Sequence, residues 1–165
     1  MNIKLFTNLK AMQALLFLLI PLTLTTASGE TLDSISAYAY RVPMLFAFLL
    51  TLSGAVFFYD GFVEPKRWYN VLSGVFLWGV VLFPHLDYSI THYAFAGCFF
   101  LWSAFNMVYF SSKKERALKI VAAGLIVLGI VVHYAFNSYS LFVAEWVGML
   151  PISVHYTLEV LEKID

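Results

Sequence analysis

Long apolar blocks alternate with short polar segments along this chain and divide it into six candidate helices. The blocks cover residues 11–26, 42–59, 69–83, 92–110, 118–136 and 141–161. Crossing the hydrocarbon core of a bilayer takes about 20 mostly apolar residues, which is close to the length of these blocks. Because the connections are short, consecutive helices should pack antiparallel. The pattern therefore predicts an all-α fold, an up-and-down polytopic membrane bundle of six transmembrane helices that forms one domain over residues 1–165.

The composition agrees with a membrane protein. Of 165 residues, 61% are hydrophobic and 12% are charged, whereas soluble domains carry about 25% charged residues. Ten basic and ten acidic side chains cancel, so the overall charge gives no argument for a nucleic-acid partner. We expect membrane lipid around the chain and no nucleic acid, and the sequence leaves open a homo-oligomer or a membrane partner protein.

Basic residues concentrate in alternate connections between the blocks. They are Lys4 and Lys10 before the first block, Lys66 and Arg67 after the second, Lys113, Lys114, Arg116 and Lys119 around the start of the fifth, and Lys163 after the sixth. The other connections carry only Arg41. Since connections rich in Lys and Arg stay in the cytoplasm, both termini should be cytoplasmic.

The first block also fits a secretory signal peptide. The segment "MNIKLFTNLKAMQALLFLLIPLTLTTASG" has a basic start, an apolar core, the helix-weakening Pro21 and a passable cleavage motif at Thr25-x-Ala27. Cleavage would leave five helices without inverting the others. The sequence leaves cleavage open.

Polar and ionisable side chains gather at the predicted non-cytoplasmic ends of the helices. The set comprises His85, Asp87, His92, His133, Asn137 and Glu145. Glu145 lies within "LFVAEWVGML", where an uncompensated carboxylate would be costly, so it should be protonated or have a partner. A hydrated turn at "PHLDYSITHY" would explain the neighbouring histidines. If the groups are buried together instead, they predict a site for a proton, a lipid headgroup or a small ligand.

Histidine and carboxylate side chains are also zinc ligands. Three protein ligands and a water would make an open catalytic centre, and the candidates are His85, His92, His133 and Glu145. Zinc is expected as a cofactor only under this interpretation. On the cytoplasmic side, His155 and Glu159 are four residues apart on the last helix and can pair on one face.

Three further features have structural interpretations. Ala47, Thr51 and Ala55 share one face of the second helix and predict a close helix contact, since small residues let backbones approach in membranes. Asp60 before Gly61 is typical of a helix end and turn. Cys98, the only cysteine, lies in an apolar block and is predicted to be a buried thiol.

The segments "SISAYAYRVPMLFAFLLTLSGAVFFYDGF", "NVLSGVFLWGVVLFP" and "HYAFAGCFF" resemble a family of uncharacterised bacterial multi-pass membrane proteins. This resemblance runs from about Ser34 to Phe100 and implies the fold and an inner-membrane location. A fainter similarity is to the CREST superfamily of alkaline ceramidases and progestin/adiponectin receptors, which combine His, Asp and Ser around an intramembrane zinc. The chain departs from that pattern. It has no clear Ser-x-x-x-His on an early helix, and its last helix has Ser153, His155 and Glu159 where the superfamily has His-x-x-x-His.

Two classes of function remain open. In the first, the chain is a non-enzymatic binding, sensing or partner-anchoring bundle with an outward-facing layer of His and carboxylate groups. In the second, it is a metal-dependent intramembrane hydrolase of a lipid or amide, with Glu145 or Asp87 as base. The absence of a recognised ligand spacing favours the first class. A transporter is disfavoured because no paired internal repeats are visible.

Overall fold

The computed structural model describes residues 3–136 and 138–161, which form helices joined by turns, with no strand among these residues. The long helices are α1 (Ile3–Ser28), α3 (Pro43–Val63), α4 (Tyr69–Leu82), α5 (Ser89–Tyr109), α6 (Arg116–Phe136) and α7 (Leu141–Val160). The short elements are the helix α2 (Tyr38–Arg41) and the 3₁₀ helices η1 (Ile35–Ala37) and η2 (Pro65–Arg67). The all-helical prediction is confirmed, and each apolar block corresponds to one long helix.

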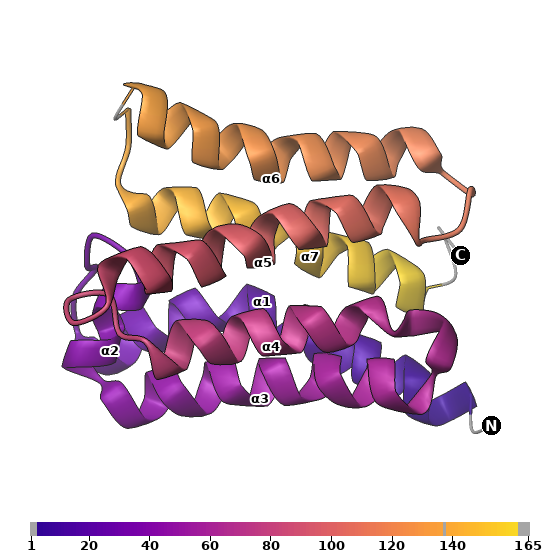
Figure 1. Ribbon diagram of the computed structural model, residues 1–165, viewed down its shortest axis with the longest axis horizontal. Helices are drawn as coiled ribbons and strands as arrows, with labels where there is room; N and C mark the ends of the chain where they lie inside the picture. Colours follow the sequence, from indigo (N-terminus) through magenta and orange to yellow (C-terminus); the bar gives the residue numbers. More distant parts are fainter. Residues whose placement is uncertain (1–2, 137, 162–165) are drawn as a thin grey trace.

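Consecutive long helices run antiparallel (Figure 1). Their contacts form a closed cycle, in which each helix packs on the next along the chain and α7 returns to pack on α1. The start of α1 and the end of α7 lie at the same end of the bundle, which we name the terminal end (Figure 1). The opposite end, which carries α2, is named the distal end.

Four helical segments of the described chain are long and apolar enough to cross a membrane. They are Asn8–Ser28, Pro43–Val63, Arg116–Phe136 and Leu141–Val160. Helix α4 has 14 residues and is therefore about 21 Å long, shorter than the roughly 30 Å of a hydrocarbon core. Helix α5 has 21 residues but includes polar side chains such as His92 and Asn106. The fold thus supports four membrane-spanning helices by length and composition.

Two glycines lie at a close contact between α3 and α4. A Cβ atom placed on Gly74 would lie 2.5 Å from the carbonyl oxygen of Gly54. Thr51 and Ala55 are exposed, so the predicted contact face was wrong, because α4 crosses the neighbouring face of α3. Cys98 is also exposed rather than buried. It lies on the outer side of α5, whereas the next residue, Phe99, faces the core.

The connection between α1 and α3 folds over the distal end and is fixed by Tyr38. The buried hydroxyl of Tyr38 donates to the carbonyl of Glu30 (3.1 Å) and accepts the amide N–H of Leu32 (3.2 Å). It also lies 2.9 Å from the hydroxyl of Thr25 in α1. These contacts hold η1 at the mouth of the bundle, close to α7.

Candidate functional site

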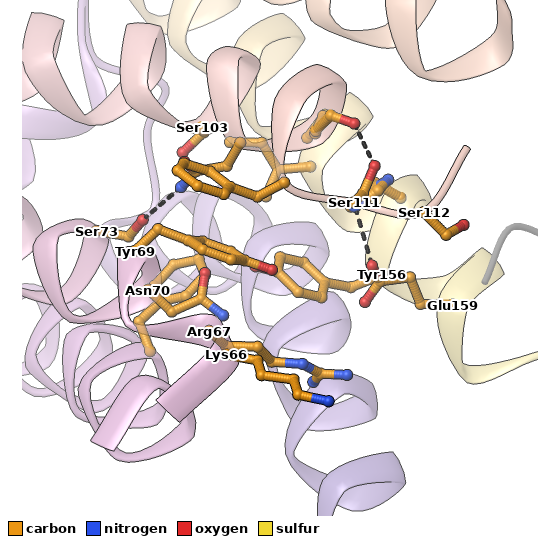
Figure 2. Close-up of a pocket in the computed structure, with 16 residues that line it drawn as sticks. Lys66, Arg67, Tyr69, Asn70, Ser73, Ser103, Ser111, Ser112, Tyr156 and Glu159 are labelled. Carbon is orange, nitrogen blue, oxygen red and sulfur yellow. Dashed lines mark hydrogen bonds and ion pairs between the residues drawn. The ribbon is translucent and has the colours of Figure 1, made fainter. Parts of the chain in front are cut away.

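A cavity of about 240 Å³ lies at the terminal end of the bundle. We name it the terminal cavity. Its polar lining comes from η2, α4, α5, the turn after α5 and α7: Lys66, Arg67, Tyr69, Asn70, Ser73, Ser103, Asn106, Ser111, Ser112, His155, Tyr156 and Glu159. Ser73 and Ser103 lie at one end of this cavity and Ser112 and Glu159 at the other (Figure 2).

The inner wall of the terminal cavity contains polar atoms that lack partners. Ser103 is 6% exposed and Asn106 is 8% exposed. The Ser103 hydroxyl and the Asn106 side-chain oxygen have no hydrogen-bond partner among the described residues, whereas the Asn106 side-chain nitrogen donates to Ser73 (3.5 Å). Buried polar atoms in proteins are nearly always hydrogen-bonded. This wall therefore has the chemistry of a binding surface for a ligand or ordered water.

The carboxylates near the terminal cavity are paired with cations. Asp60, at the end of α3, accepts a hydrogen bond from Asn70 (2.6 Å) and forms an ion pair with Arg67 (3.3 Å). Glu159 pairs with Lys10 of α1 (2.8 Å) and with His155 (3.2 Å). Pairing offsets the cost of burying these charges.

These pairs test two interpretations of the sequence. The predicted contact between His155 and Glu159 is confirmed. The interpretation of Asp60 as a turn residue was incomplete, because its carboxylate is buried and joins α3 to α4.

A second polar cluster lies at the distal end. Glu145 of α7 is buried, and its carboxyl group accepts the amide N–H of Ile35 (2.5 Å). The hydroxyl of Ser36 lies 3.5 Å from the other carboxyl oxygen and 2.8 Å from Nε2 of His92. Nδ1 of His92 lies 2.8 Å from the carbonyl oxygen of Phe83. Because a carbonyl only accepts, Nδ1 carries a hydrogen, which leaves Nε2 to interact with Ser36.

A smaller cavity of about 40 Å³ lies beside this cluster, and we name it the distal cavity. Glu145, Ser36 and Ser53 supply its polar lining, and the rest of the lining is apolar. Ser53 is fully buried, and its hydroxyl has no partner within the described part of the chain. The volume is sufficient for a few water molecules at about 10–15 Å³ each.

One family model matches a part of the chain that includes all the residues lining the two cavities. The family of unknown function DUF7103 matches residues 17–160. The chain belongs to the DUF7103 family. No curated protein and no solved structure matches the chain, so the similarity to the CREST superfamily is not shown. The expected resemblance to an uncharacterised family agrees with the DUF7103 match.

In this DUF7103 member, some of the predicted distal residues come together. His92 and Glu145 are joined through Ser36. The ring of His85 lies 5.7 Å from that of His92, and its Nδ1 is buried without a partner among the described residues. Asp87 is exposed and accepts a long hydrogen bond from Tyr40 (3.4 Å).

The remaining predicted residues are placed differently. Nδ1 of His133 lies 2.7 Å from the carbonyl oxygen of Tyr139, and Asn137 lies outside the described residues. The structure does not bring together the four predicted zinc ligands His85, His92, His133 and Glu145. Over residues 3–136 and 138–161, no three His, Cys, Asp or Glu side chains could hold one metal ion. The physical reason at Glu145 is that Ser36 lies between it and His92.

Several residues of these sites in the DUF7103 chain were not predicted from the sequence. They are Ser36 and Ser53 at the distal cavity and Ser73, Ser103 and Asn106 at the terminal cavity. One signal was present, since Ser103 and Asn106 are three residues apart in an apolar helix and therefore share a face. The distant pairing of Ser36 with α5 and α7 has no local signature.

Proposed function

We propose that this DUF7103 member is a multi-pass protein of the bacterial inner membrane that binds a small polar molecule in its terminal cavity without transforming it. In this proposal the six long helices span the bilayer, and the terminal end faces the cytoplasm. The observation that carries the binding function is the wall formed by Ser103 and Asn106, where two buried polar atoms lack partners among the described residues. A bound ligand would supply the missing hydrogen bonds.

The proposed topology is supported by packing and charge. Helices α4 and α5 pack between α3 and α6 in the same bundle as the four long apolar segments. The aromatic residues Trp68 and Tyr69 lie at the start of α4, which is typical of a membrane interface. Short helices can span by local thinning of the bilayer. The two turns at the terminal end carry Lys66, Arg67, Lys113 and Lys114, whereas the connections at the distal end carry only Arg41. This asymmetry favours a cytoplasmic position for the terminal end.

The lining of the terminal cavity indicates the class of ligand. The side-chain oxygen of Asn106 requires a hydrogen-bond donor, and the Ser103 hydroxyl can either donate or accept. A ligand with hydroxyl groups would satisfy both. The exposed Lys66 and the neighbouring Arg67 at the rim favour an anionic group on the same ligand. A polyol phosphate has this chemistry, either as a soluble molecule or as the headgroup of a phosphatidylglycerol lipid.

Binding to the purified protein tests this function. We expect glycerol phosphate to raise the thermal unfolding temperature in detergent and to add its mass in native mass spectrometry. If the source is a lipid, phosphatidylglycerol should be retained in native mass spectrometry and phosphatidylcholine should not. Asn106→Leu, which removes the unpartnered oxygen, should abolish binding of either probe.

Two variants that remove the same charge test whether the anionic group of the ligand binds at the rim of the terminal cavity. Lys66→Gln should weaken binding, because Lys66 lines the cavity. Lys113→Gln makes the same change at an exposed position in the next turn at the terminal end and should leave binding unchanged. Failure of both probes to bind, or equal binding by wild type and Asn106→Leu, would contradict the proposed function.

A further inference from the structure

The two cavities meet at a layer of aromatic side chains in the middle of the bundle. Phe57 lines the terminal cavity, whereas Phe17 and Phe99 line the distal cavity. The ring centroids are 5.8 Å apart for Phe17 and Phe57, 5.7 Å for Phe17 and Phe99, and 6.1 Å for Phe57 and Phe99. These three mutually packed rings therefore lie between the polar terminal cavity and the distal cavity, whose polar groups are Glu145, Ser36 and Ser53.

The distal cavity extends the polar cluster toward this aromatic layer. Glu145 and Ser36 lie on its wall together with the buried hydroxyl of Ser53, which lacks a partner among the described residues. Ser53 lies at the middle of α3, one helical turn from Phe57. A few water molecules in the cavity would satisfy Ser53 and connect Glu145 with the layer.

The cluster of Glu145, Ser36 and His92 can hold one proton in two arrangements. When His92 is protonated, Nε2–H donates to the Ser36 hydroxyl, and Ser36 O–H donates to the Glu145 carboxylate. Each of these two hydrogens can shift along its hydrogen bond to the acceptor atom. The N–H bond at Nε2 of His92 then breaks, and an O–H bond forms on Glu145. Ser36 exchanges one hydrogen for another, so the products are neutral His92 and protonated Glu145. No other reactant is needed.

Other side chains surround the cluster of Glu145, Ser36 and His92, and some of them lie between it and the protein surface. His85 lies between His92 and the exposed Tyr40, whose ring packs on His85 edge-on at 5.2 Å. On α6, Tyr134 is a titratable side chain in the neighbourhood of Glu145. From α1, α3 and α4, the side chains that line the distal cavity are apolar except for Ser53. Intramembrane His and carboxylate groups of this kind are typical of proton relays.

We propose that the two cavities are the two halves of a proton path through the bundle, closed in this structure by Phe57, and that Glu145, Ser36 and His92 bind the proton in the distal half. A metal cation fits this space poorly, because hard cations need about six or more oxygen ligands and the distal cavity is largely apolar. This inference goes beyond the proposed binding function. It requires the terminal cavity only as a water-accessible space, with no ligand in it.

Proton flux into liposomes tests the path. The purified full chain is reconstituted with an enclosed pH-sensitive dye, and a potassium gradient with valinomycin drives proton entry. We expect Phe57→Leu to raise the rate of proton entry severalfold over wild type. Glu145→Gln added to Phe57→Leu should return the rate to the wild-type value. Equal rates with and without Glu145→Gln, or no increase with Phe57→Leu, would overturn the proposal.

Two matched control variants distinguish a specific proton path from a nonspecific leak of protons across the membrane. Phe48→Leu makes the same change at an exposed position of α3 and should leave the rate at the wild-type value. Glu30→Gln makes the same change as Glu145→Gln, but in a surface ion pair with Arg41 (2.9 Å). It should leave the raised rate of Phe57→Leu unchanged. An equal rise with Phe48→Leu, or an equal loss with Glu30→Gln, would overturn the assignment of the path.

An infrared measurement on protein with Phe57 intact tests the proton site even if the Phe57→Leu variant folds poorly. Infrared spectra of the wild type across a pH titration should contain the C=O band of a carboxyl group that is lost in Glu145→Gln and shifted in His92→Gln. Glu30→Gln should retain the band unchanged. If no carboxyl band depends on Glu145, the proton site is absent, and the proposal fails independently of any result with glycerol phosphate.

Discussion

At the scale of single residues, one hydroxyl group secures the distal end. The Tyr38 hydroxyl bonds to backbone atoms of Glu30 and Leu32 and to the Thr25 side chain. Tyr38→Phe leaves these groups without that partner in a partly buried place, so we expect a loss of about 1–3 kcal/mol in unfolding free energy. Thermal unfolding in detergent measures the loss. Tyr109→Phe, at an exposed tyrosine, should change stability by less than about 0.5 kcal/mol, and equal losses would contradict the role of Tyr38.

The chemistry of individual residues was more predictable than their partners. The apolar sequence around Glu145 implied that its carboxyl group needs a partner, and the structure provides two. The partners are the amide of Ile35 and the hydroxyl of Ser36, which are 110 and 109 positions away in sequence. His133 was predicted as a member of the same site as Glu145, but its Nδ1 lies beside the carbonyl oxygen of Tyr139. The direction in which each helix face points depends on tertiary packing, so no local pattern specified these contacts.

At the scale of secondary-structure elements, the contact of α3 with α4 depends on the absence of side chains. In Gly74→Ala the new methyl group would lie 2.5 Å from the Gly54 carbonyl oxygen, and backbone cannot move aside cheaply. We expect a loss of about 1–3 kcal/mol in unfolding free energy, measured by thermal unfolding in detergent.

Two other glycines provide controls for this contact. A Cβ atom at Gly97 or Gly124 would meet nothing within 4 Å. Both Gly→Ala changes should therefore be neutral or stabilise by up to about 1 kcal/mol, through higher helix propensity. If Gly74→Ala behaved like these controls, the two helices would have to be further apart than in this structure.

The positions of the helices could be predicted, but their contact faces could not. Polar interruptions between apolar blocks located all six long helices, because apolar length dominates the sequence. The prediction that Thr51 and Ala55 form a helix contact was wrong because α3 is apolar nearly all round. Such a helix lacks the one-sided pattern that identifies a buried face. The number of spans does not follow from apolar length alone, since α4 is short and α5 carries polar core residues.

At the scale of the whole molecule, the turn between α4 and α5 distinguishes six spans from four. If α4 and α5 cross the bilayer, this turn lies on the non-cytoplasmic side together with the turn between α6 and α7. If only the four long apolar segments cross, α4 and α5 form a hairpin whose turn stays within the membrane. The exposed Asp87 and Ser138 report on the two distal turns, and the exposed Lys113 reports on the terminal end.

Cysteine labelling can read this difference in a Cys98→Ala background, because Cys98 is the only native cysteine. In spheroplasts, a membrane-impermeant maleimide should label Asp87→Cys and Ser138→Cys, and it should label Lys113→Cys only after the membrane is permeabilised. This pattern follows from six spans with the basic terminal end in the cytoplasm. Labelling of Ser138→Cys without Asp87→Cys would instead establish a four-span protein with a re-entrant hairpin. Labelling of Lys113→Cys in intact spheroplasts would show the opposite orientation, with the terminal cavity on the outer side of the membrane.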